Sequence, residues 1–322
     1  MKPTIIDSKL KLIHPLRKDD VKRKSKRGKV LKIISLVFLY LFLIALAIIV
    51  IFPFYYMIVG SFMKEVDITN GKLLPQTGNL FENINYNYSQ TVNRLNIGRY
   101  IGNSLLVVLA TTIGMLIITI AAAFAFAKLK FKGRDLIFMI LLATMMIPGE
   151  MMMISNYSTM ITLNLIKTET TQTFSDAFLV MVLPHLVSVF YIYLLRENFK
   201  QIPDELYLAA KVDGMSDWKY MYKVMVPLAS PTIITITILQ IIYTWNSYAW
   251  PNLTVKNRTF APLSVIIRDT STLAIQVSAD NLQVQYSWVM AASVITVLPL
   301  LVLFIVFRKY IMKRSSREGI KG

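Results

Sequence analysis

The sequence predicts an all-α polytopic membrane protein with six transmembrane helices, and three observations lead to this prediction. The chain has 322 residues, of which 55% are hydrophobic and only 16% are charged, and its mean hydropathy is +0.54. Such a composition is too apolar for a soluble domain. Six apolar runs are each long enough to cross a bilayer, which takes roughly 17–25 helical residues. The basic residues, finally, are concentrated in alternate connecting segments.

The six predicted spans combine this length with very few charged residues. They are residues 33–57, 100–127, 136–154, 177–195, 228–250 and 286–307. Four prolines lie within or at the ends of these runs, namely Pro53, Pro148, Pro184 and Pro299. Proline is tolerated in a spanning helix because neighbouring helices satisfy the freed carbonyl groups.

The lysines and arginines set the predicted orientation, because basic residues are retained on the cytoplasmic side of a membrane. Of the 35 basic residues, 27 lie in segments 1–32, 128–135, 196–226 and 308–322, and the other eight lie in segments 58–99, 155–176 and 251–283. Both termini are therefore predicted to be cytoplasmic. The formal net charge of +17 is then mostly a signal of topology, and nucleic acid is not expected as a partner.

Three parts follow from this topology: a basic cytoplasmic tail (1–32), a transmembrane domain (33–307) and a C-terminal cytoplasmic tail (308–322). The first tail contains the run Lys-Arg-Lys-Ser-Lys-Arg-Gly-Lys at 22–29. We expect this run to hold the N-terminus inside and to contact anionic membrane lipid, with a partner-binding role as the alternative. Segments 58–99 and 251–283 are expected to form the surface that faces outward.

The chain lacks the motifs of a self-sufficient enzyme. It contains no cysteine, which excludes disulfides, thiolate metal sites and cysteine nucleophiles. No Gly-x-x-x-x-Gly-Lys-Ser/Thr occurs, so the chain has no phosphate-binding loop of its own, and no His-Glu-x-x-His or Gly-x-Ser-x-Gly occurs either. The methionines between 145 and 153 are interpreted as adaptable packing, with a copper site as the alternative.

The polar segment 203–227, between the fourth and fifth spans, is predicted to form a helix, a turn and a second helix on the cytoplasmic side. Pro203 fits the start of the first helix, and Asp204 and Glu205 place negative charge at its N-terminus. Gly214 is predicted to end this helix in the left-handed conformation.

One face of the first helix is predicted to be nearly flat, so that a partner can approach it closely. By helical spacing, that face carries Leu206, Ala209, Ala210 and Asp213. Ser216 is predicted to cap the second helix, and Pro227 to break the chain where the fifth span begins. Two alanines and a glycine alone would favour an ordinary amphipathic connector.

The complete pattern is more specific than its parts. Leu-Tyr-Leu-Ala-Ala-Lys-Val-Asp-Gly at 206–214, closed by Val-Met-Val-Pro at 224–227, resembles the coupling-loop signature of ABC importer permeases. In that signature Glu-Ala-Ala, a glycine and an aliphatic-x-aliphatic-Pro recur at this spacing. Trp-Asn-Ser-Tyr-Ala-Trp-Pro at 245–251 and the terminal Gly-Ile-Lys-Gly look like the carbohydrate-importer class, of the subunit type similar to the maltose permease G component. The likeness covers residues of about 33 to 322.

This resemblance implies which residues transmit force from an ATPase. The expected coupling residues are Glu205, Leu208, Ala209, Ala210, Asp213, Gly214 and Pro227, and the expected ATPase-interface tail consists of Gly319, Lys321 and Gly322. The family usually has Glu where this chain has Leu208. Glu205 lies one helical turn earlier and is the candidate to replace it.

The resemblance also implies a division of labour among subunits in the cytoplasmic membrane of a bacterium or archaeon. A second homologous permease completes the pore, two ATPase subunits bind ATP and Mg, and an extracytoplasmic sugar-binding protein delivers the substrate. No cofactor is expected in this chain, and no metal site is expected either.

Sugar sites pair aromatic faces with amide and hydroxyl groups, and Tyr243 and Asn246 supply that chemistry at the outer end of the fifth span. Interfacial anchoring is the alternative for aromatic residues at such a position. Glu150 and His185 are intramembrane candidates, but the sequence favours a simply solvated carboxylate and a buried, neutral, hydrogen-bonded imidazole over a functional role.

The sequence therefore favours the non-catalytic permease subunit of an ATP-driven carbohydrate importer. Glycerol phosphate or another small polar solute is the alternative substrate. The alternative from another class is an ion-coupled secondary transporter, which would need buried ionisable residues in several spans.

Overall fold

The computed structural model describes residues 18–269, 273–278 and 281–318. The chain divides into two compact units, residues 1–57 and residues 58–322. The first part of the chain forms α1 (Lys18–Gly60), α2 (Glu65–Thr69), α3 (Leu80–Leu95), α4 (Ile97–Lys128), α5 (Arg134–Thr144) and α6 (Gly149–Thr162).

The middle of the chain forms a series of shorter helices. They are α7 (Phe174–Val182), η2 (Leu183–His185), α8 (Val189–Lys200), α9 (Asp204–Val212), α10 (Asp217–Tyr220), η3 (Met221–Met225), α11 (Val226–Leu228) and α12 (Ser230–Asn246). The last part forms α13 (Ala249–Thr254), η4 (Arg258–Phe260), α14 (Leu263–Ile266), β1 (Ala274–Ser278), β2 (Asn281–Val284) and α15 (Tyr286–Glu318).

The first unit consists, in its described residues, of the single helix α1, which begins at Lys18 and so continues without a break from the basic segment into the first predicted span. The aliphatic and aromatic side chains of residues 33–54 are exposed on every side of this helix. A helix that is apolar all round needs a membrane or a partner around it. This arrangement agrees with the predicted span 33–57.

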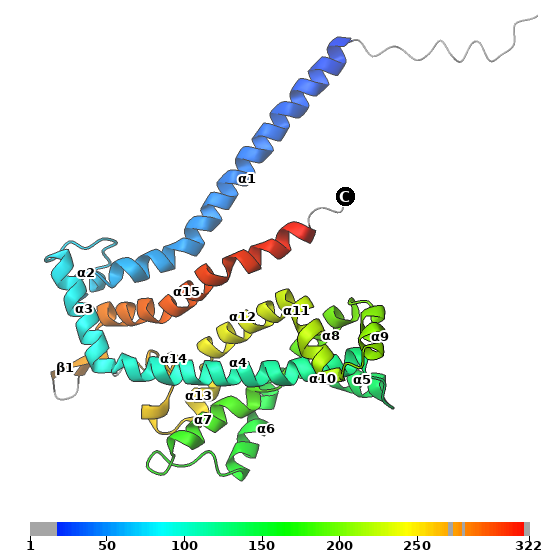
Figure 1. The fold of residues 1–322 in the computed structure, drawn as a ribbon. Helices are drawn as coiled ribbons and strands as arrows, with labels where there is room; N and C mark the ends of the chain where they lie inside the picture. The colour runs from blue at the N-terminus through cyan, green and yellow to red at the C-terminus, as the bar shows by residue number, and fades with distance from the viewer. Residues whose placement is uncertain (1–17, 270–272, 279–280, 319–322) are drawn as a thin grey trace, which may run out of the picture. The chain divides into compact units, whose positions relative to one another are not determined.

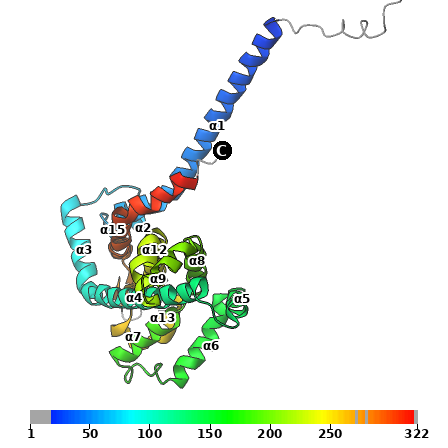
Figure 2. The same cartoon turned by 45° about the vertical axis from the view of Figure 1, so that its right-hand side comes forward.

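Helix α4 is the centre of the second unit, and α8 and α12 pack along it (Figures 1 and 2). Its 32 residues contain the second predicted span, 100–127. Toward its C-terminal end, Met115 and Phe124 pack with Leu195 and Phe199 of α8 and with Met225 of η3 in one buried cluster. Burying each such side chain contributes roughly 1.5–3 kcal/mol, so this cluster holds the segment 203–227 against the membrane helices.

Three of the predicted spans are bent rather than straight. The predicted span 136–154 is divided into α5 and α6, which meet at 100°, and the predicted span 177–195 is divided into α7–η2 and α8, which meet at 48°. Pro148 lies in the first break, and Pro184 lies in η2 just before the second, where a missing N–H and the ring disturb the helix. The predicted spans are therefore bent near these prolines, and each bent pair can still form one span.

The chain breaks at the start of the fifth span, two residues after the predicted position. Pro227 lies inside α11, and the chain bends by 81° after Leu228, at Ala229. Just before Pro227, the helix widens into the π-helical turn η3. In a regular α-helix the proline ring would clash there with a preceding carbonyl. The helix therefore absorbs Pro227, and α12 begins two residues later than the predicted break.

The segment 58–99 is ordered by buried polar contacts. Asp67 is 3% exposed and its carboxylate accepts hydrogen bonds from the backbone N–H of Gln76 (3.0 Å) and Thr77 (2.9 Å) and from the Thr77 hydroxyl (2.7 Å). Burial alone raises the pKa of Asp67, but these hydrogen bonds outweigh it and hold the pKa below its ordinary value. The sequence did not predict helices α2 and α3 here.

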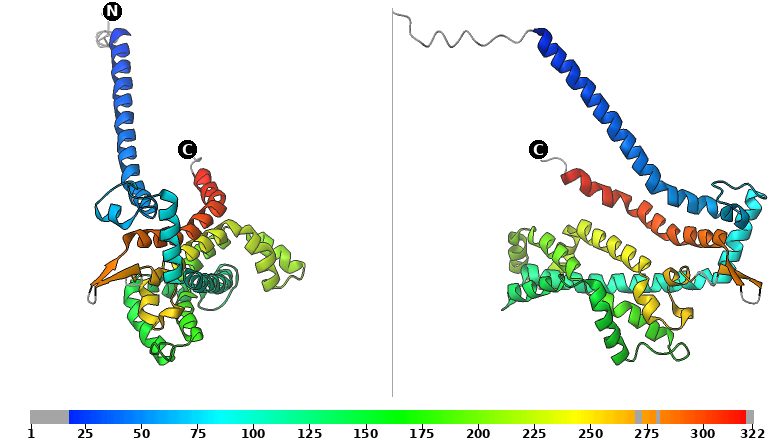
Figure 3. Two further views of the ribbon diagram at one scale, coloured as in Figure 1. Left: turned by 90° about the vertical axis from the view of Figure 1, so that its left-hand side faces the viewer. Right: turned by 180° about the vertical axis from the view of Figure 1, so that it is seen from behind.

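The segment after α13 is fastened to α4 and to the loop before α7. Asn103 donates hydrogen bonds to the carbonyls of Thr259 (3.1 Å) and Ala261 (3.0 Å), and Gln172 binds the backbone of Thr254, Lys256 and Asn257. An antiparallel hairpin of β1 and β2 follows and lies near the junction of α3 and α4 (Figure 3). The fold is thus almost entirely helical, with one short hairpin that was not expected.

The described residues contain three helices long and apolar enough to cross a membrane, α1, α4 and α15, or up to six spans if each bent pair counts as one. The chain is a multi-pass helical membrane protein. The prediction of six spans corresponds to the upper limit of this range.

Candidate coupling surface and transport cavity

Helix α9 ends in a glycine-centred C-cap. Gly214 has a φ of +71°, as the sequence predicted. The Met215 N–H donates to the carbonyl of Ala210 (2.9 Å), and the Gly214 N–H donates to the carbonyl of Lys211 (3.0 Å). These two bonds form a Schellman motif, in which a glycine avoids the cost of a left-handed side-chain-bearing residue. The turn between α9 and α10 is therefore fixed by the backbone.

The second helix begins as predicted, because the Ser216 hydroxyl accepts a hydrogen bond from the Lys219 N–H (3.4 Å). A tyrosine and an ion pair close the turn further. The Tyr207 hydroxyl donates to the Asp217 carboxylate (2.6 Å), and Lys211 forms an ion pair with the same carboxylate (2.8 Å). Burial, followed by the hydrogen bond to Asp217, raises the pKa of Tyr207 to about 12.

The two alanines of the coupling pattern differ in exposure. Ala210 is 8% exposed and packs in the cluster beneath the segment, whereas Ala209 is exposed. Of the predicted flat face, Leu206, Ala209 and Asp213 are exposed as predicted, whereas Ala210 is buried. The outward residues one turn apart are Glu205, Leu208, Ala209 and Val212.

This outward surface of α9, which we call the coupling face (Glu205, Leu208, Ala209 and Val212), is unusually apolar for a polar segment. Leu208 is 62% exposed and Val212 is 87% exposed. On the second helix, Trp218 and Tyr222 are also exposed. Exposed apolar residues that gather on one surface mark an interaction site. The sequence prediction missed Val212, because it assigned the exposed face from the alanines.

The segment 203–227, which we call the coupling segment, is attached to the C-terminal end of α4 by a buried lysine. The Lys128 side chain is 2% exposed, and its ammonium donates to the carbonyl of Ile202 (2.7 Å) and to the carboxylate of Asp204 (2.5 Å). The hydrogen bond and the charge of Lys128 lower the pKa of Asp204. Asp204 thus serves both the N-terminus of α9 and the connection to α4. No motif or spacing in the sequence predicted the pairing of Lys128 with Asp204.

The predicted ATPase-interface tail, Gly319, Lys321 and Gly322, lies outside the described residues. Asp213 forms the C-cap of α9 and is exposed, and Pro227 is exposed inside α11. The structure therefore brings most of the predicted coupling residues onto one side of α9 and its following turn, with Ala210 beneath them.

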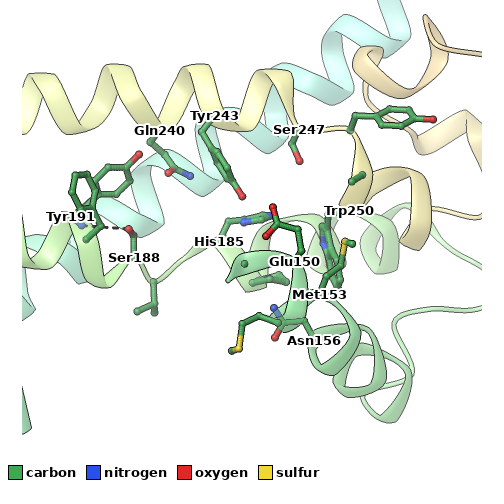
Figure 4. A pocket seen from close by; sticks show the side chains of 17 residues that line it. Glu150, Met153, Asn156, His185, Ser188, Tyr191, Gln240, Tyr243, Ser247 and Trp250 are labelled. Atoms are coloured by element: carbon green, nitrogen blue, oxygen red, sulfur yellow. Dashed lines mark hydrogen bonds between the residues drawn. The ribbon is translucent and has the colours of Figure 1, made fainter. Parts of the chain in front are cut away.

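A cavity of about 540 Å³ lies where the two proline breaks meet α12. Figure 4 shows Glu150 from the start of α6, His185 from η2 and Tyr243 from α12 pointing toward one another. The ring centres of His185 and Tyr243 lie 5.6 Å apart, and the ring planes are nearly perpendicular. Asn156, Gln240 and Ser247 add amide and hydroxyl groups to the wall, and Trp250 and Tyr248 add aromatic rings.

The bent spans explain why these residues meet. Because the helices are interrupted at Pro148 and Pro184, the residues that follow each proline turn into the space beside α12. Non-helical backbone at membrane depth is tolerated where it lines such a cavity. Sequence reasoning considered Glu150 and His185 separately, and only the two nearby prolines signalled that they would share a site.

The two predicted substrate residues differ in position. Tyr243 lines the cavity, whereas Asn246 does not, and the amide of Asn246 donates to the carbonyl of Ile242 on its own helix (2.9 Å). Tyr243 and Asn246 are three residues apart, which places them about 60° apart around the helix. Trp250 is buried and its indole N–H donates to the carbonyl of Val180 (2.9 Å), so it supports the wall as well.

The charges of the cavity wall are few. The lining contains one carboxylate, that of Glu150, one imidazole, that of His185, and no lysine or arginine. Among the residues that the structure describes, no group of three or more histidines, aspartates or glutamates could hold a metal ion. The cavity chemistry is therefore that of hydroxyl, amide and aromatic groups.

Comparison with known proteins places this geometry in context. The family described as "Binding-protein-dependent transport system inner membrane component" matches residues 114–317. The arabinooligosaccharide transport permease AraQ of Halalkalibacterium halodurans is 28% identical, over 86% of this chain and 93% of that protein. The sn-glycerol-3-phosphate transport permease UgpE of Yersinia pestis is 25% identical, over 86% of this chain and 94% of that protein.

A solved structure has the same fold. A chain of a bacterial ABC transporter involved in the import of the acidic polysaccharide alginate superposes with a TM-score of 0.72, covering 88% of this chain and 97% of that chain at 24% sequence identity.

Proposed function

The chain belongs to the family of binding-protein-dependent transport inner membrane components, and from that premise we propose that its substrate is a neutral carbohydrate. As a member it is the non-catalytic permease of an ABC importer, in the bacterial inner membrane, and it works in a complex with an ATPase and a binding protein.

The composition of the cavity supports a neutral saccharide. Aromatic rings bind the apolar C–H faces of a sugar, while amides and hydroxyls bind its OH groups, and Tyr243, Asn156 and Gln240 supply both. The absence of lysine and arginine from the lining is the observation that carries this proposal. A buried anion without a cationic partner is strongly disfavoured.

Glycerol 3-phosphate, named for the relative UgpE, is the second candidate substrate. Its phosphate would have to lie beside Glu150 without a basic residue on this side of the pore. The same argument applies to an acidic polysaccharide such as that of the alginate importer. A neutral oligosaccharide, as named for AraQ, fits the wall better.

The cavity is open on one side, where Tyr243 is 56% exposed and Phe190 is 46% exposed. We place a second, homologous permease against this side, so that the two chains enclose the path together. In this arrangement residues 33–307 form the transmembrane domain with six spans, and the tails 1–32 and 308–322 lie in the cytoplasm. The segments 58–99 and 251–283 then face a sugar-binding protein outside.

Two ATPase subunits, which bind ATP and Mg, complete the proposed assembly. One of them receives the coupling face in a cleft, with Asp213 and Gly214 fixing the turn behind it. Because Leu208 stands where the family usually has Glu, the cleft of the partner ATPase should present apolar side chains to Leu208 and Val212, which are both well exposed. Gly319, Lys321 and Gly322 are proposed to lie along the interface of the ATPases.

Transport by the purified complex with its binding protein in proteoliposomes tests this function. We expect ATP-dependent uptake of a neutral trisaccharide, such as arabinotriose or maltotriose, and none of glycerol 3-phosphate. Tyr243→Ala should lower uptake roughly tenfold, as expected for loss of one aromatic contact in a binding site. Asn246→Ala is the matched control, because Asn246 is on the same helix outside the cavity. Uptake of glycerol 3-phosphate alone would overturn the proposal.

A further inference from the structure

A second cavity, distant in sequence from the first, lies where α2, α3 and the start of α15 meet. Its volume is about 530 Å³. Helix α15 packs against both α2 and α3, and the three helices are seen together in Figure 1. The lining includes Glu65 of α2, Glu82 and Tyr86 of α3, and Gln285 and Trp288 beside and within α15. None of these residues lines the transport cavity.

The wall of this second cavity is built from fixed contacts. Glu65 accepts a hydrogen bond from the Ser287 N–H (3.0 Å), which joins α2 to α15. The buried amide of Asn87, in α3, donates to the carbonyls of Ser61 (3.0 Å) and Met63 (2.8 Å). Trp288 is 2% exposed, and the guanidinium of Arg94 lies 4.6 Å from the centre of its ring. The cavity therefore exists without an occupant to shape it.

The chemistry of the wall suits a polyhydroxylated solute. The ring of Tyr86 is 55% exposed and lies 6.3 Å from that of Trp288, so it offers a face for stacking. Carboxylates of Glu65 and Glu82 accept hydrogen bonds from hydroxyls, and amides of Asn83 and Gln285 both donate and accept.

Two polar atoms of the lining residues have no hydrogen-bond partner among the described residues. They are one carboxylate oxygen of Glu65, an acceptor, and the indole nitrogen of Trp288, a donor. A buried polar atom without a partner is costly. Both atoms are themselves buried, so the groups that an occupant can reach include the exposed ring of Tyr86 and the exposed carboxylate of Glu82.

We propose that this cavity is a second saccharide site, separate from the transport cavity, which binds a neutral sugar on the extracytoplasmic side of the permease. The assignment of the side rests on the proposed function and its topology, in which segment 58–99 faces outward. Two carboxylates against the single ammonium of Lys64 disfavour an acidic ligand. The site would hold a sugar near the binding protein before it enters the pore.

Saturation-transfer NMR on the full complex in lipid nanodiscs tests this site, with maltotriose, arabinotriose and an alginate trisaccharide as probes. We expect transfer to the two neutral sugars and none to the acidic one. Tyr86→Ala should weaken the binding of the neutral sugars roughly tenfold through loss of the stacking face, and Tyr86→Phe, which keeps the ring, should bind almost as well as the native chain.

Two further variants separate this site from the transport cavity. Phe81→Ala, on α3 at an 80% exposed position outside the cavity, is the matched control and should bind sugar normally. Tyr243→Ala should also retain the signal that depends on Tyr86. Equal transfer in the native and Tyr86→Ala complexes, or no transfer to any neutral sugar, would overturn the second site.

The outcomes also separate this inference from the proposed function. If transfer depends on Tyr243 and not on Tyr86, the transport cavity alone binds sugar, and the second site is refuted while the importer function stands. If transfer depends on Tyr86 but no neutral sugar is taken up in proteoliposomes, the second site stands and the proposed substrate is wrong.

Discussion

Replacement of Gly214 by proline should separate ATP hydrolysis from transport. Gly214 has a φ of +71°, whereas proline is fixed near −65°. Proline also lacks the N–H that donates to the carbonyl of Lys211 at 3.0 Å. A proline forced into an incompatible helix position costs about 3 kcal/mol or more, which lowers the population of the native turn by more than about 100-fold. The coupling face would then no longer be held in its native orientation.

Alanine at position 214 is a milder perturbation than proline. Gly214→Ala has free space for the added Cβ, since no atom lies within 4 Å of it. Its cost is therefore only that of the left-handed conformation, about 1–2 kcal/mol, or roughly 5–30-fold in population. We expect coupling to fall in the order glycine, alanine, proline, while insertion into the membrane is unchanged.

The assay is the number of ATP molecules hydrolysed per sugar transported in proteoliposomes. Gly71→Pro is the matched control, because Gly71 has a φ of +67°, has equally open surroundings, and donates its N–H to the carbonyl of Ile68 (2.9 Å). It carries the same local strain outside the coupling segment. Unchanged uptake in Gly214→Pro, or an equal defect in Gly71→Pro, would refute the reasoning.

Three other predictions concern the coupling segment. Leu208→Asp should weaken association with the ATPase at least roughly tenfold, since burying a leucine contributes about 1.5–3 kcal/mol. Co-purification of the ATPase measures this association, and Lys219→Ser is the control. An undiminished yield of ATPase with Leu208→Asp would contradict the prediction. Asp204→Ala should destabilise the chain by about 1 kcal/mol. It removes the countercharge of a buried lysine, but the Asp204 carboxylate is 80% exposed, and solvent screening reduces the cost. Thermal unfolding measures this change, with the exposed Asp213→Ala as control. The pH dependence follows from two pKa shifts. The lowered pKa of Asp204 gives stability that is present above 3.8 and is lost only as pH falls through its folded value. The raised pKa of Tyr207 gives stability that is present below 10.0 and is lost only as pH rises through about 12. After correction for the intrinsic exchange rate, hydrogen exchange of residues 203–217 should therefore show constant protection between pH 3.8 and pH 10.0. Loss of protection near neutral pH would contradict this prediction.

The local structure of the coupling segment could be predicted from its sequence because the signals there are short-range. Gly214, Ser216 and the acidic residues at the start of α9 act on the backbone within one turn, and the structure has the cap and the turn as predicted. Which alanine faces outward depends instead on what the helix packs against. Ala210 is buried in a cluster with Met115 and Phe124 of α4 and Leu195 of α8, and these residues come from other parts of the chain.

The same distinction applies to the spans. Hydrophobic runs identify where the chain can cross a membrane, but a run gives no information about bending within it. Pro148, Pro184 and Pro227 were all recognised, yet Pro148 lies in a break between helices, whereas Pro184 and Pro227 lie inside short helical turns that are followed by a bend. The outcome depends on whether neighbouring turns can widen, as η3 does, and this is decided by packing. The cavity containing Glu150, His185 and Tyr243 could not be predicted for the same reason.

The attachment of Lys128 to the coupling segment gives α4 the properties of a lever. With 32 residues and a rise of about 1.5 Å per residue, α4 is about 48 Å long. Its fulcrum end is held at Ile202 and Asp204, and near its other end Asn103 holds the carbonyls of Thr259 and Ala261. A tilt of about 10° at the fulcrum would sweep the far end through about 8 Å over this length. A small rotation imposed by ATPase closure would thus be amplified, with the segment around 259–261 travelling farthest.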